Sequence, residues 1–212
     1  MKLYLARAMT RMVAGLAAAT LLTLTVQAGA LSDAVLAPGG FAGAESGVLL
    51  TYSHTRTLPP SAARSNLVDT RVWLQSDPGE HGPVLSLFQE SDGKARPIAA
   101  FPAQGANPVL LYYLEGVVHA MAEATGGSPF YIRNRIRDAL VMAPAGEVTD
   151  GRVTAVVTPF ARDPNRAHMG SFGDLTLTLT YPSAAPTRLL SLSADTPGGD
   201  TGYHDTMHLM GE

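Results

Sequence analysis

Alternating hydrophobic and polar residues run through most of the chain after Gly47 and predict a β-rich domain. In 48–57, Val48, Leu50 and Tyr52 fall on one face and serine and threonine on the other, which is the period of a half-buried strand. The same pattern predicts about eight strands, at 48–57, 67–75, 84–89, 95–101, 152–158, 174–181, 187–194 and 202–210.

Turn residues indicate that neighbouring strands pair antiparallel. Asp92-Gly93 lies between two of the predicted strands, and Asp-Gly is favoured in tight hairpins because both central residues adopt positive φ. Pro97 cannot donate a backbone hydrogen bond to a neighbour. We therefore expect the second strand of this hairpin to lie at a sheet edge.

The hydrophobic period changes over about 107–142 and predicts a helical hairpin. Asn107-Pro108 and Ser128-Pro129 each place an N-cap residue before a proline at the first helical position, and Gly126-Gly127 ends the first helix. Apolar residues then recur at spacings of three and four, as in helices with one buried stripe. They are Leu110, Leu114, Val117, Val118 and Met121, followed by Ile132, Ile136, Ala139 and Leu140.

Together these elements predict the α+β class. We expect a single antiparallel, curved, half-barrel-like β-sheet of about eight strands, with the two-helix hairpin inserted mid-chain and packing on it. No internal repeat or long linker divides the chain, so one domain is expected over 47–212. Residues 31–46 are rich in glycine and alanine without a clear period, which predicts a flexible lead.

Residues 1–30 have the features of a cleavable secretory signal in the right order. Lys2, Arg7 and Arg11 precede an apolar run at 13–26, and Ala28-Gly29-Ala30 supplies the small residues of a cleavage site. The run is shorter than the roughly 18–20 residues that span a bilayer as a helix. We expect cleavage near Ala30 and a soluble periplasmic or secreted protein without a membrane span. An uncleaved N-terminal anchor is the alternative.

Charge and cysteine content narrow the possible functions. The predicted signal holds three of the fifteen lysines and arginines and none of the eighteen acidic residues, which leaves the mature chain with a formal net charge of −6. Such a chain gains little from counterion release at phosphates, so no nucleic-acid partner is expected. The absence of cysteine excludes thiol catalysis and cysteine-ligated metals. Abundant alanine, glycine and arginine with little lysine favour a bacterial origin.

Two arginines on the second predicted helix form a candidate anion site. Arg133 and Arg137 lie one helical turn apart, and guanidinium groups bind carboxylate or phosphate through paired hydrogen bonds. Free backbone N–H groups near Ser128, at the helix start, would add to this site. The alternative is a solvent-facing surface on which these arginines pair with Asp138 and neighbouring acids.

Aromatic residues also gather in the helical hairpin. Tyr112 and Tyr113 lie in the first helix, and Phe130 and Tyr131 open the second. Most such clusters belong to a hydrophobic core. Tyr112 and Tyr131 are nevertheless candidates to line an apolar groove between the sheet and the hairpin, where a small ligand could bind.

The loop at 160–172 is the longest between well-defined strands and contains Arg166 and His168. Long loops on a rigid sheet often carry binding or catalytic residues. Both side chains are therefore ligand-binding candidates, with an ordinary hairpin loop as the alternative.

Metal and nucleophile patterns are weak. His204 and His208 could share a zinc ion on a helix, but on a strand over 202–210 their side chains lie about 13 Å apart, so we expect neither a metal site nor a cofactor. Ser91 and Lys94 flank an expected turn, and Gly170-Ser171 lacks the spacing of a nucleophile elbow. No catalytic residue is assigned.

The patterns favour a non-enzymatic exported protein with a binding, carrier or envelope-accessory role. Its partner is expected to be a small apolar or anionic ligand, or another envelope protein, and the apolar groove between sheet and hairpin is its expected site. An exported hydrolase with a site around the 160–172 loop is the alternative.

Overall fold

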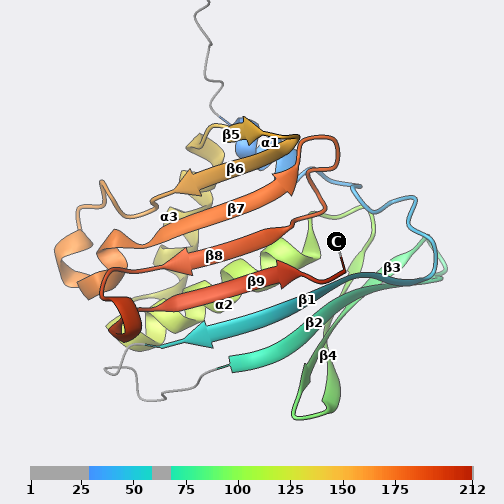
Figure 1. The fold of residues 1–212 in the computed structure, drawn as a ribbon, viewed down its shortest axis with the longest axis horizontal. Helices are drawn as coiled ribbons and strands as arrows, with labels where there is room; N and C mark the ends of the chain where they lie inside the picture. The colour runs from blue at the N-terminus through green and yellow to red at the C-terminus, as the bar shows by residue number, and fades with distance from the viewer. Residues whose placement is uncertain (1–28, 59–67, 212) are drawn as a thin grey trace, which may run out of the picture.

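The computed structural model describes residues 29–58 and 68–211 and shows an α+β fold on one open antiparallel sheet (Figure 1). The predicted signal is almost entirely outside these residues. The nine strands of the described chain have the order β4-β3-β2-β1-β9-β8-β7-β6-β5. They are β1 (Gly47–Thr57), β2 (Val68–Asp77), β3 (Val84–Ser91), β4 (Lys94–Pro102), β5 (Glu147–Thr149), β6 (Arg152–Val157), β7 (Thr176–Pro182), β8 (Ser191–Asp195) and β9 (His204–Leu209).

Two runs of sequential strands meet in the middle of the sheet. Strands β1 to β4 pair in chain order, as do β5 to β9, and β1 pairs with β9 between the two runs. Across this pair Thr55 faces Thr206, 151 positions later in the chain, and their hydroxyls are 2.7 Å apart. Strands β4 and β5 are left as edges, so the sheet does not close. The fold thus brings distant parts of the sequence together at its centre.

The short strand β5 is the addition to the expected set of strands. It pairs with β6 through a turn at Asp150-Gly151, whose φ angles are 50° and 75°. The predicted hairpin at Asp92-Gly93 is confirmed, with φ angles of 51° and 71°. Both are the positive-φ turns that Asp-Gly favours. Strand β5 escaped prediction because three residues are too few to show an alternation.

Pro97 lies on β4, and β4 is at the sheet edge as predicted. The register between β3 and β4 shifts here: Phe88 faces Pro97, whereas Leu87 faces Ala99. One residue, Ile98, is therefore extra on β4. A bulge of this kind tolerates a proline that cannot donate to the ladder.

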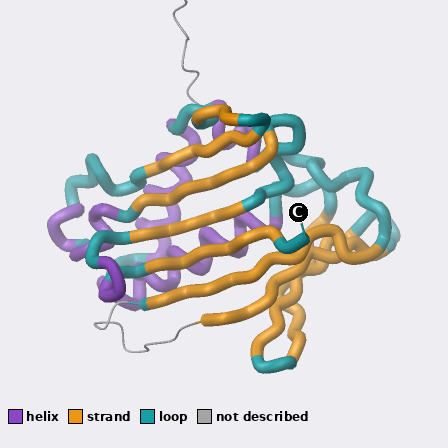
Figure 2. Tube along the Cα trace, viewed as in Figure 1, coloured by secondary structure: helices purple, strands orange, loops and turns teal. Residues whose placement is uncertain are grey.

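The helical hairpin forms where its capping residues place it. Helix α2 spans Pro108–Thr125, and the Asn107 side chain accepts hydrogen bonds from its first backbone amides. Helix α3 spans Pro129–Met142, with Ser128 as its N-cap. Both helices lie on one face of the sheet (Figure 1, Figure 2), leaving the other face to the serines and threonines of the strands.

Most of the predicted apolar stripe of α2 is buried, with one exception. Leu110, Val117, Val118 and Met121 are at most 1% exposed. Leu114 is only half-buried, where it lines a small depression between α2 and α3. Its place toward the sheet is taken by Tyr113, which is 1% exposed. The predicted stripe is thus correct at four of its five positions, but it includes Leu114 where the structure has Tyr113.

The predicted flexible lead at 31–46 contains a short helix, α1 (Ala30–Val35). Leu31 and Val35 have no exposed surface, and the Leu31 amide donates to the Ala143 carbonyl beyond the end of α3 at 3.4 Å. The i, i+4 spacing of Leu31 and Val35 buries both on one side of a single helical turn. The first part of the lead is therefore structured, contrary to expectation.

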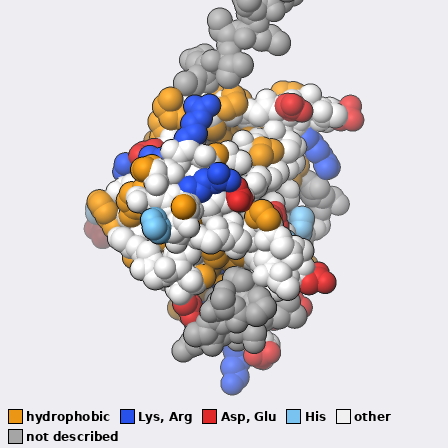
Figure 3. All heavy atoms as spheres, turned by 90° about the vertical axis from the view of Figure 1, so that its left-hand side faces the viewer, with side chains coloured by type: hydrophobic (Ala, Val, Ile, Leu, Met, Phe, Trp, Pro, Cys, Tyr) orange, Lys and Arg blue, Asp and Glu red, His pale blue; other side chains and the backbone are white. Residues whose placement is uncertain are grey.

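Three 3₁₀ helices connect the later strands: η1 (Arg166–His168), η2 (Gly170–Asp174) and η3 (Gly199–Thr201). Figure 3 looks onto the end of the molecule that carries them and shows basic, acidic and hydrophobic side chains interspersed. Within the described chain, no helix combines the length and the apolar character needed to cross a membrane.

Candidate ligand-binding site

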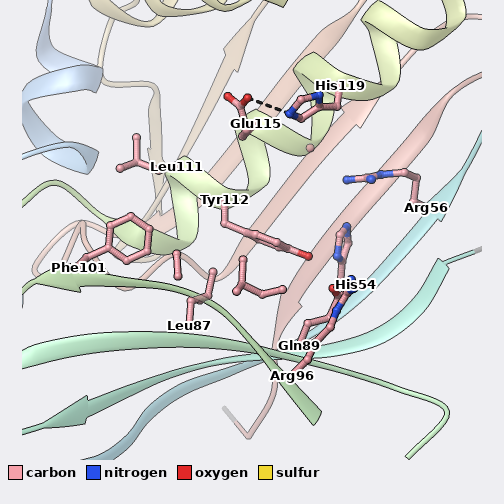
Figure 4. Close-up of a pocket in the computed structure, with 13 residues that line it drawn as sticks. His54, Arg56, Leu87, Gln89, Arg96, Phe101, Leu111, Tyr112, Glu115 and His119 are labelled. Atoms are coloured by element: carbon pink, nitrogen blue, oxygen red, sulfur yellow. Dashed lines mark hydrogen bonds and ion pairs between the residues drawn. The ribbon is translucent and has the colours of Figure 1, made fainter. Parts of the chain in front are cut away.

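A cavity of about 640 Å³ is lined by residues of helix α2 and of strands β1, β3 and β4. This size falls within the range of small-molecule sites, roughly 300–1,000 Å³. Figure 4 shows that its two ends differ in character. Leu87, Phe101 and Leu111 lie at one end, and His54 and Arg56 lie at the other.

The polar end rests on a fully buried carboxylate, Asp205 of β9. Its Oδ1 lies 2.8 Å from His54 Nε2, and its Oδ2 accepts from Arg56 Nε and from the Tyr203 hydroxyl, each at 2.7 Å. The Tyr113 hydroxyl of α2 donates to the Asp205 backbone carbonyl at 2.7 Å. A buried charge of this kind is tolerated only because it is paired and hydrogen-bonded.

Strand alternation puts these groups on the same face of the sheet. On β1, His54 continues the inward positions of Leu50 and Tyr52. On β9, Asp205 lies directly opposite Arg56. The β1–β9 pair therefore sets the ionic contact through its register, because a slip by one residue would turn one partner to the other face.

A glycine in α2 makes room for the arginine. A Cβ atom at Gly116 would lie 2.4 Å from Arg56 Nη2, closer than any real carbon–nitrogen contact. The Arg56 guanidinium thus lies against the helix backbone, with one edge bonded to Asp205. Gly116 thus leaves the space that the Arg56 guanidinium occupies between α2 and the β1–β9 ion pair.

The network fixes the charge states of its members. Burial acts to raise the pKa of Asp205, but the hydrogen bond from His54 and the charge of Arg56 outweigh it, and the pKa falls below its ordinary value of 3.8. Burial raises the pKa of Tyr113 and Tyr203 well above 10.0. Asp205 is therefore an ionised acceptor at neutral pH, and both tyrosines remain hydrogen-bond donors.

One atom of this network lacks a partner within the described chain. His54 is 1% exposed, and its Nδ1 has no hydrogen bond there although its Nε2 is bound to Asp205. His54 nevertheless lines the cavity, and Figure 4 shows the Tyr112 hydroxyl pointing toward it. The two rings are 6.0 Å apart in an edge-to-face arrangement. A polar atom of a ligand in the cavity could satisfy both groups.

Further charged groups surround the cavity. Arg96 of β4 donates to the Gln89 side chain of β3 at 2.8 Å, and Figure 4 shows both beside His54, with Arg56 on the other side of His54. Glu115 of α2 lies on a different side, where it bonds Arg133 and His119. The hydrogen bond from Arg133 lowers the pKa of Glu115. The two acids near the cavity, Asp205 and Glu115, are thus each paired with an arginine.

The two arginines of the predicted anion site line one depression between α2 and α3, and each is paired with a carboxylate. Arg133 forms a two-pronged contact with Glu115, through Nε at 2.9 Å and Nη2 at 2.5 Å. Arg137 is exposed and bonds its neighbour Asp138 at 3.1 Å. Each guanidinium is occupied by a carboxylate of the chain, which is the alternative that the sequence left open. Of the predicted ligand-binding residues, Tyr112 lines the large cavity.

Tyr131 instead belongs to a second buried carboxylate cluster, around Asp163. The Asp163 carboxylate accepts from the Tyr131 hydroxyl at 2.8 Å, from Arg135 Nε at 2.6 Å and from the Asn165 backbone amide at 2.8 Å. This cluster ties the 160–172 loop to α3. Burial acts to raise the pKa of Asp163, but these hydrogen bonds outweigh it and lower the pKa.

The two ligand-binding candidates of the 160–172 loop, Arg166 and His168, do not line the large cavity. Arg166 donates to the Gly173 carbonyl and pairs with Asp174 across η1 and η2. His168 is exposed and, with Tyr131, lines a smaller cavity of about 370 Å³. No described serine or carboxylate is bonded to the His168 side chain. The polar contacts of Arg166 therefore stabilise the conformation of the loop itself.

His204 and His208 lie on strand β9, as predicted, on the same face. His204 Nδ1 bonds Asp195 at 2.9 Å and its Nε2 bonds the Gly199 carbonyl at 2.6 Å. Those two hydrogen bonds raise the pKa of His204 above 6.5. Over the described residues, no group of three histidine or acidic side chains is arranged to hold a metal ion.

The central residues of the site, His54, Arg56 and Asp205, were not singled out from the sequence. A signal was present, because His54 and Asp205 fall at inward positions of alternating strands, where an apolar residue is expected. What the sequence could not reveal is that β1 and β9 are neighbours. Without that pairing, a histidine and an aspartate 151 positions apart are unrelated polar residues.

Comparison with known proteins adds no family to this picture. No protein-family model matches the chain, and a search of curated proteins finds no match. The function is therefore inferred from the geometry of the site.

Proposed function

We propose that this chain is an exported, non-enzymatic binding protein that holds a small amphipathic molecule in the cavity between α2 and strands β1, β3 and β4. The observation that carries the proposal is the composition of the cavity, which joins an apolar end to a polar end where His54 Nδ1 has no partner within the described chain. The ligand would then lie between the curved, half-barrel-like sheet and the helical hairpin.

An unpartnered buried polar atom supports a ligand rather than a purely structural role. Leaving a buried donor or acceptor unsatisfied costs about 1–3 kcal/mol, and most such atoms in proteins are bonded to the protein or to water. The Asp205 carboxylate and the Tyr113 and Tyr203 hydroxyls of this network are all bonded within the chain. A ligand that supplies one polar atom to Nδ1 would remove this cost and gain affinity from it.

The lining of the cavity favours binding over catalysis. Its described lining residues include no serine, threonine or lysine that could act as a nucleophile. Asp205, the only acid bonded to His54, has no exposed surface and is already saturated with donors. The hydrolase alternative around 160–172 has less support, since Asp163 in that loop is bonded on all sides.

Export is the part of the proposal that rests on sequence. The basic start, the apolar run at 13–26 and Ala28-Gly29-Ala30 support a signal that is cleaved near Ala30. Cleavage there would keep Leu31 and Val35, the two buried residues of α1, in the mature protein. The mature protein would then work in the periplasm or outside the cell, with a small ligand or another envelope protein as its partner.

A titration with two ten-carbon probes, 1-decanol and decanoate, tests the proposed function. We expect at least one of them to shift the methyl NMR resonances of Leu87, Ile98 and Leu111, which line the cavity. Ala99→Phe, inside the cavity, should abolish the shifts, whereas Ala100→Phe, on the exposed side of β4, should leave them. Absence of binding by both probes, or equal binding by Ala99→Phe, would contradict the proposal.

A further inference from the structure

We propose that the ligand of this cavity is a monocarboxylate with an unbranched or aromatic apolar tail, its carboxyl group held by Arg56, Arg96 and Tyr112 beside His54. This inference rests on the proposed function and specifies the ligand that the same cavity selects. It orients the ligand as well, with the tail directed toward Leu87, Phe101 and Leu111.

The hydrogen-bonding groups at the polar end are mainly donors. Arg56 uses its Nε on Asp205 and keeps its terminal nitrogens, while Arg96 uses one terminal nitrogen on Gln89. The Tyr112 hydroxyl points to His54 from the opposite wall. Burial raises the pKa of Tyr112, so this hydroxyl keeps its proton. A carboxylate has only acceptor atoms and matches the donors of Arg56, Arg96 and Tyr112, whereas an ammonium group, which has only donors, does not.

The fixed charges favour one negative charge on the ligand. Arg56 and Arg96 are positive and Asp205 is negative, which leaves an excess of one positive charge at this end. Glu115 does not cancel it, because Arg133 and His119 are bonded to Glu115 on another side of the cavity. A monoanion therefore completes the charge balance, and a dianion would exceed it.

The apolar end determines the other half of the ligand. Leu87 is fully buried, Phe101 and Ala99 are half-buried, and Leu111 and Ile98 are exposed at the cavity wall. Burying apolar ligand surface against such side chains is favourable by roughly 25 cal/mol per Å². A tail of several methylene groups or an aromatic ring would cover the exposed surface of Ile98, Leu111 and Phe101.

Three ten-carbon probes with different head groups test the inference on the full mature chain: decanoate, 1-decanol and decyltrimethylammonium. Isothermal titration calorimetry below their micelle concentrations should show that decanoate binds about tenfold more tightly than 1-decanol, the effect of one charge-assisted hydrogen-bonded contact. The ammonium probe should bind more weakly than either.

Two matched arginine variants locate the head group. Arg96→Gln should remove most of the preference for decanoate and leave the affinity for 1-decanol unchanged. Arg71→Gln is the control, because Arg71 is also an exposed strand arginine but pairs with Glu90 and lies over Trp73, away from the cavity. It should change neither affinity.

The outcomes separate the inference from the function on which it rests. Equal binding of decanoate and 1-decanol, tight binding of the ammonium probe, or equal losses in the Arg96→Gln and Arg71→Gln proteins would overturn the carboxylate inference and leave a binding cavity. Binding of none of the three probes would overturn both.

Discussion

Two buried aspartates each organise a cluster of polar side chains in this molecule, and they differ in how completely they are enclosed. Asp163 draws Tyr131, Arg135 and the Asn165 amide around its carboxylate and closes the 160–172 loop. Asp205 binds His54, Arg56 and Tyr203 at the seam between β1 and β9. Both carboxylates have pKa values below the ordinary range.

The difference lies in the outer layer of each cluster. The partners of Asp163 are also bonded to one another, since Asn165 Nδ2 donates to the Tyr131 hydroxyl at 3.0 Å. Around Asp205 the next atom outward is His54 Nδ1, which has no partner among the described residues and belongs to a side chain that lines a cavity. A self-contained cluster indicates a structural role, and an incomplete one beside a cavity indicates a binding site.

The largest expected effect is the loss of stability on replacing Asp205. Asp205→Asn removes the negative charge that faces Arg56 and cannot accept all three hydrogen bonds. Breaking a buried ion pair in this way costs about 3–5 kcal/mol, measured as the free energy of unfolding in urea. A loss under about 1 kcal/mol would show that the network does not hold β1 to β9.

The dependence of stability on pH in acid tests the charge state of Asp205. Because the folded pKa of Asp205 lies below its ordinary value of 3.8, its contribution is complete above that value and is lost as the pH falls through the folded pKa. The gap in unfolding free energy between the parent and Asp205→Asn proteins should therefore narrow below pH 3.8. A gap that widens there would contradict the assigned charge state.

Asp163→Asn should have a smaller effect on stability and none on binding. Its loss is expected at about 1–3 kcal/mol, because Arg135 is a third exposed and can turn to water. Decanoate affinity, measured by calorimetry, should match that of the parent protein. A matching loss of affinity would mean that the loop cluster and the cavity act as one site.

Two tyrosines give the finest contrast between the clusters. Tyr131→Phe should lower the unfolding free energy by about 0.5–1.5 kcal/mol, since its hydroxyl is bonded to Asp163. Tyr112→Phe should change stability by less than about 0.5 kcal/mol but weaken decanoate binding. The reverse pattern, in urea melts and calorimetry, would exchange the roles given to the two hydroxyls.

The smallest expected effect belongs to His204, whose contacts face solvent. Hydrogen bonds from His204 to the Asp195 carboxylate and the Gly199 carbonyl raise its pKa above 6.5, so its contribution is complete below 6.5 and is lost as the pH rises through the folded pKa. His204→Asn should thus be slightly destabilising in mild acid and neutral in alkaline buffer. Thermal melts at both pH values would reveal any opposite trend.

The sequence predicted the local elements far better than the site. Hairpin turns, helix caps and strand alternation depend on neighbours in the chain, and so Asp92-Gly93, Asn107 and Ser128 are found where their chemistry predicts. The site depends on which strands are adjacent, and nothing local encodes the pairing of β1 with β9. Tyr112 was identified because it is aromatic and next to the apolar stripe of α2.

The same limit explains why the sequence pointed to Arg133 and Arg137 and not to the two arginines that line the cavity. Arg133 and Arg137 share a helix face. Asp138 was named from the sequence as a possible partner, but Glu115, which binds Arg133 from α2, is recognised only once the helices are placed. Arg56 and Arg96 sit on strands from different parts of the chain and meet only at the cavity. Spacing along one element therefore favoured the arginines that were already paired.

The central claim is that the cavity beside His54 is a ligand site, and the ring nitrogens of His54 report on it directly. In a protein with ¹⁵N-labelled histidine, saturation with decanoate should shift the Nδ1 resonance of His54 and leave those of His168 and His204 in place. An unchanged His54 resonance at saturating decanoate, or shifts confined to His168, would contradict the account.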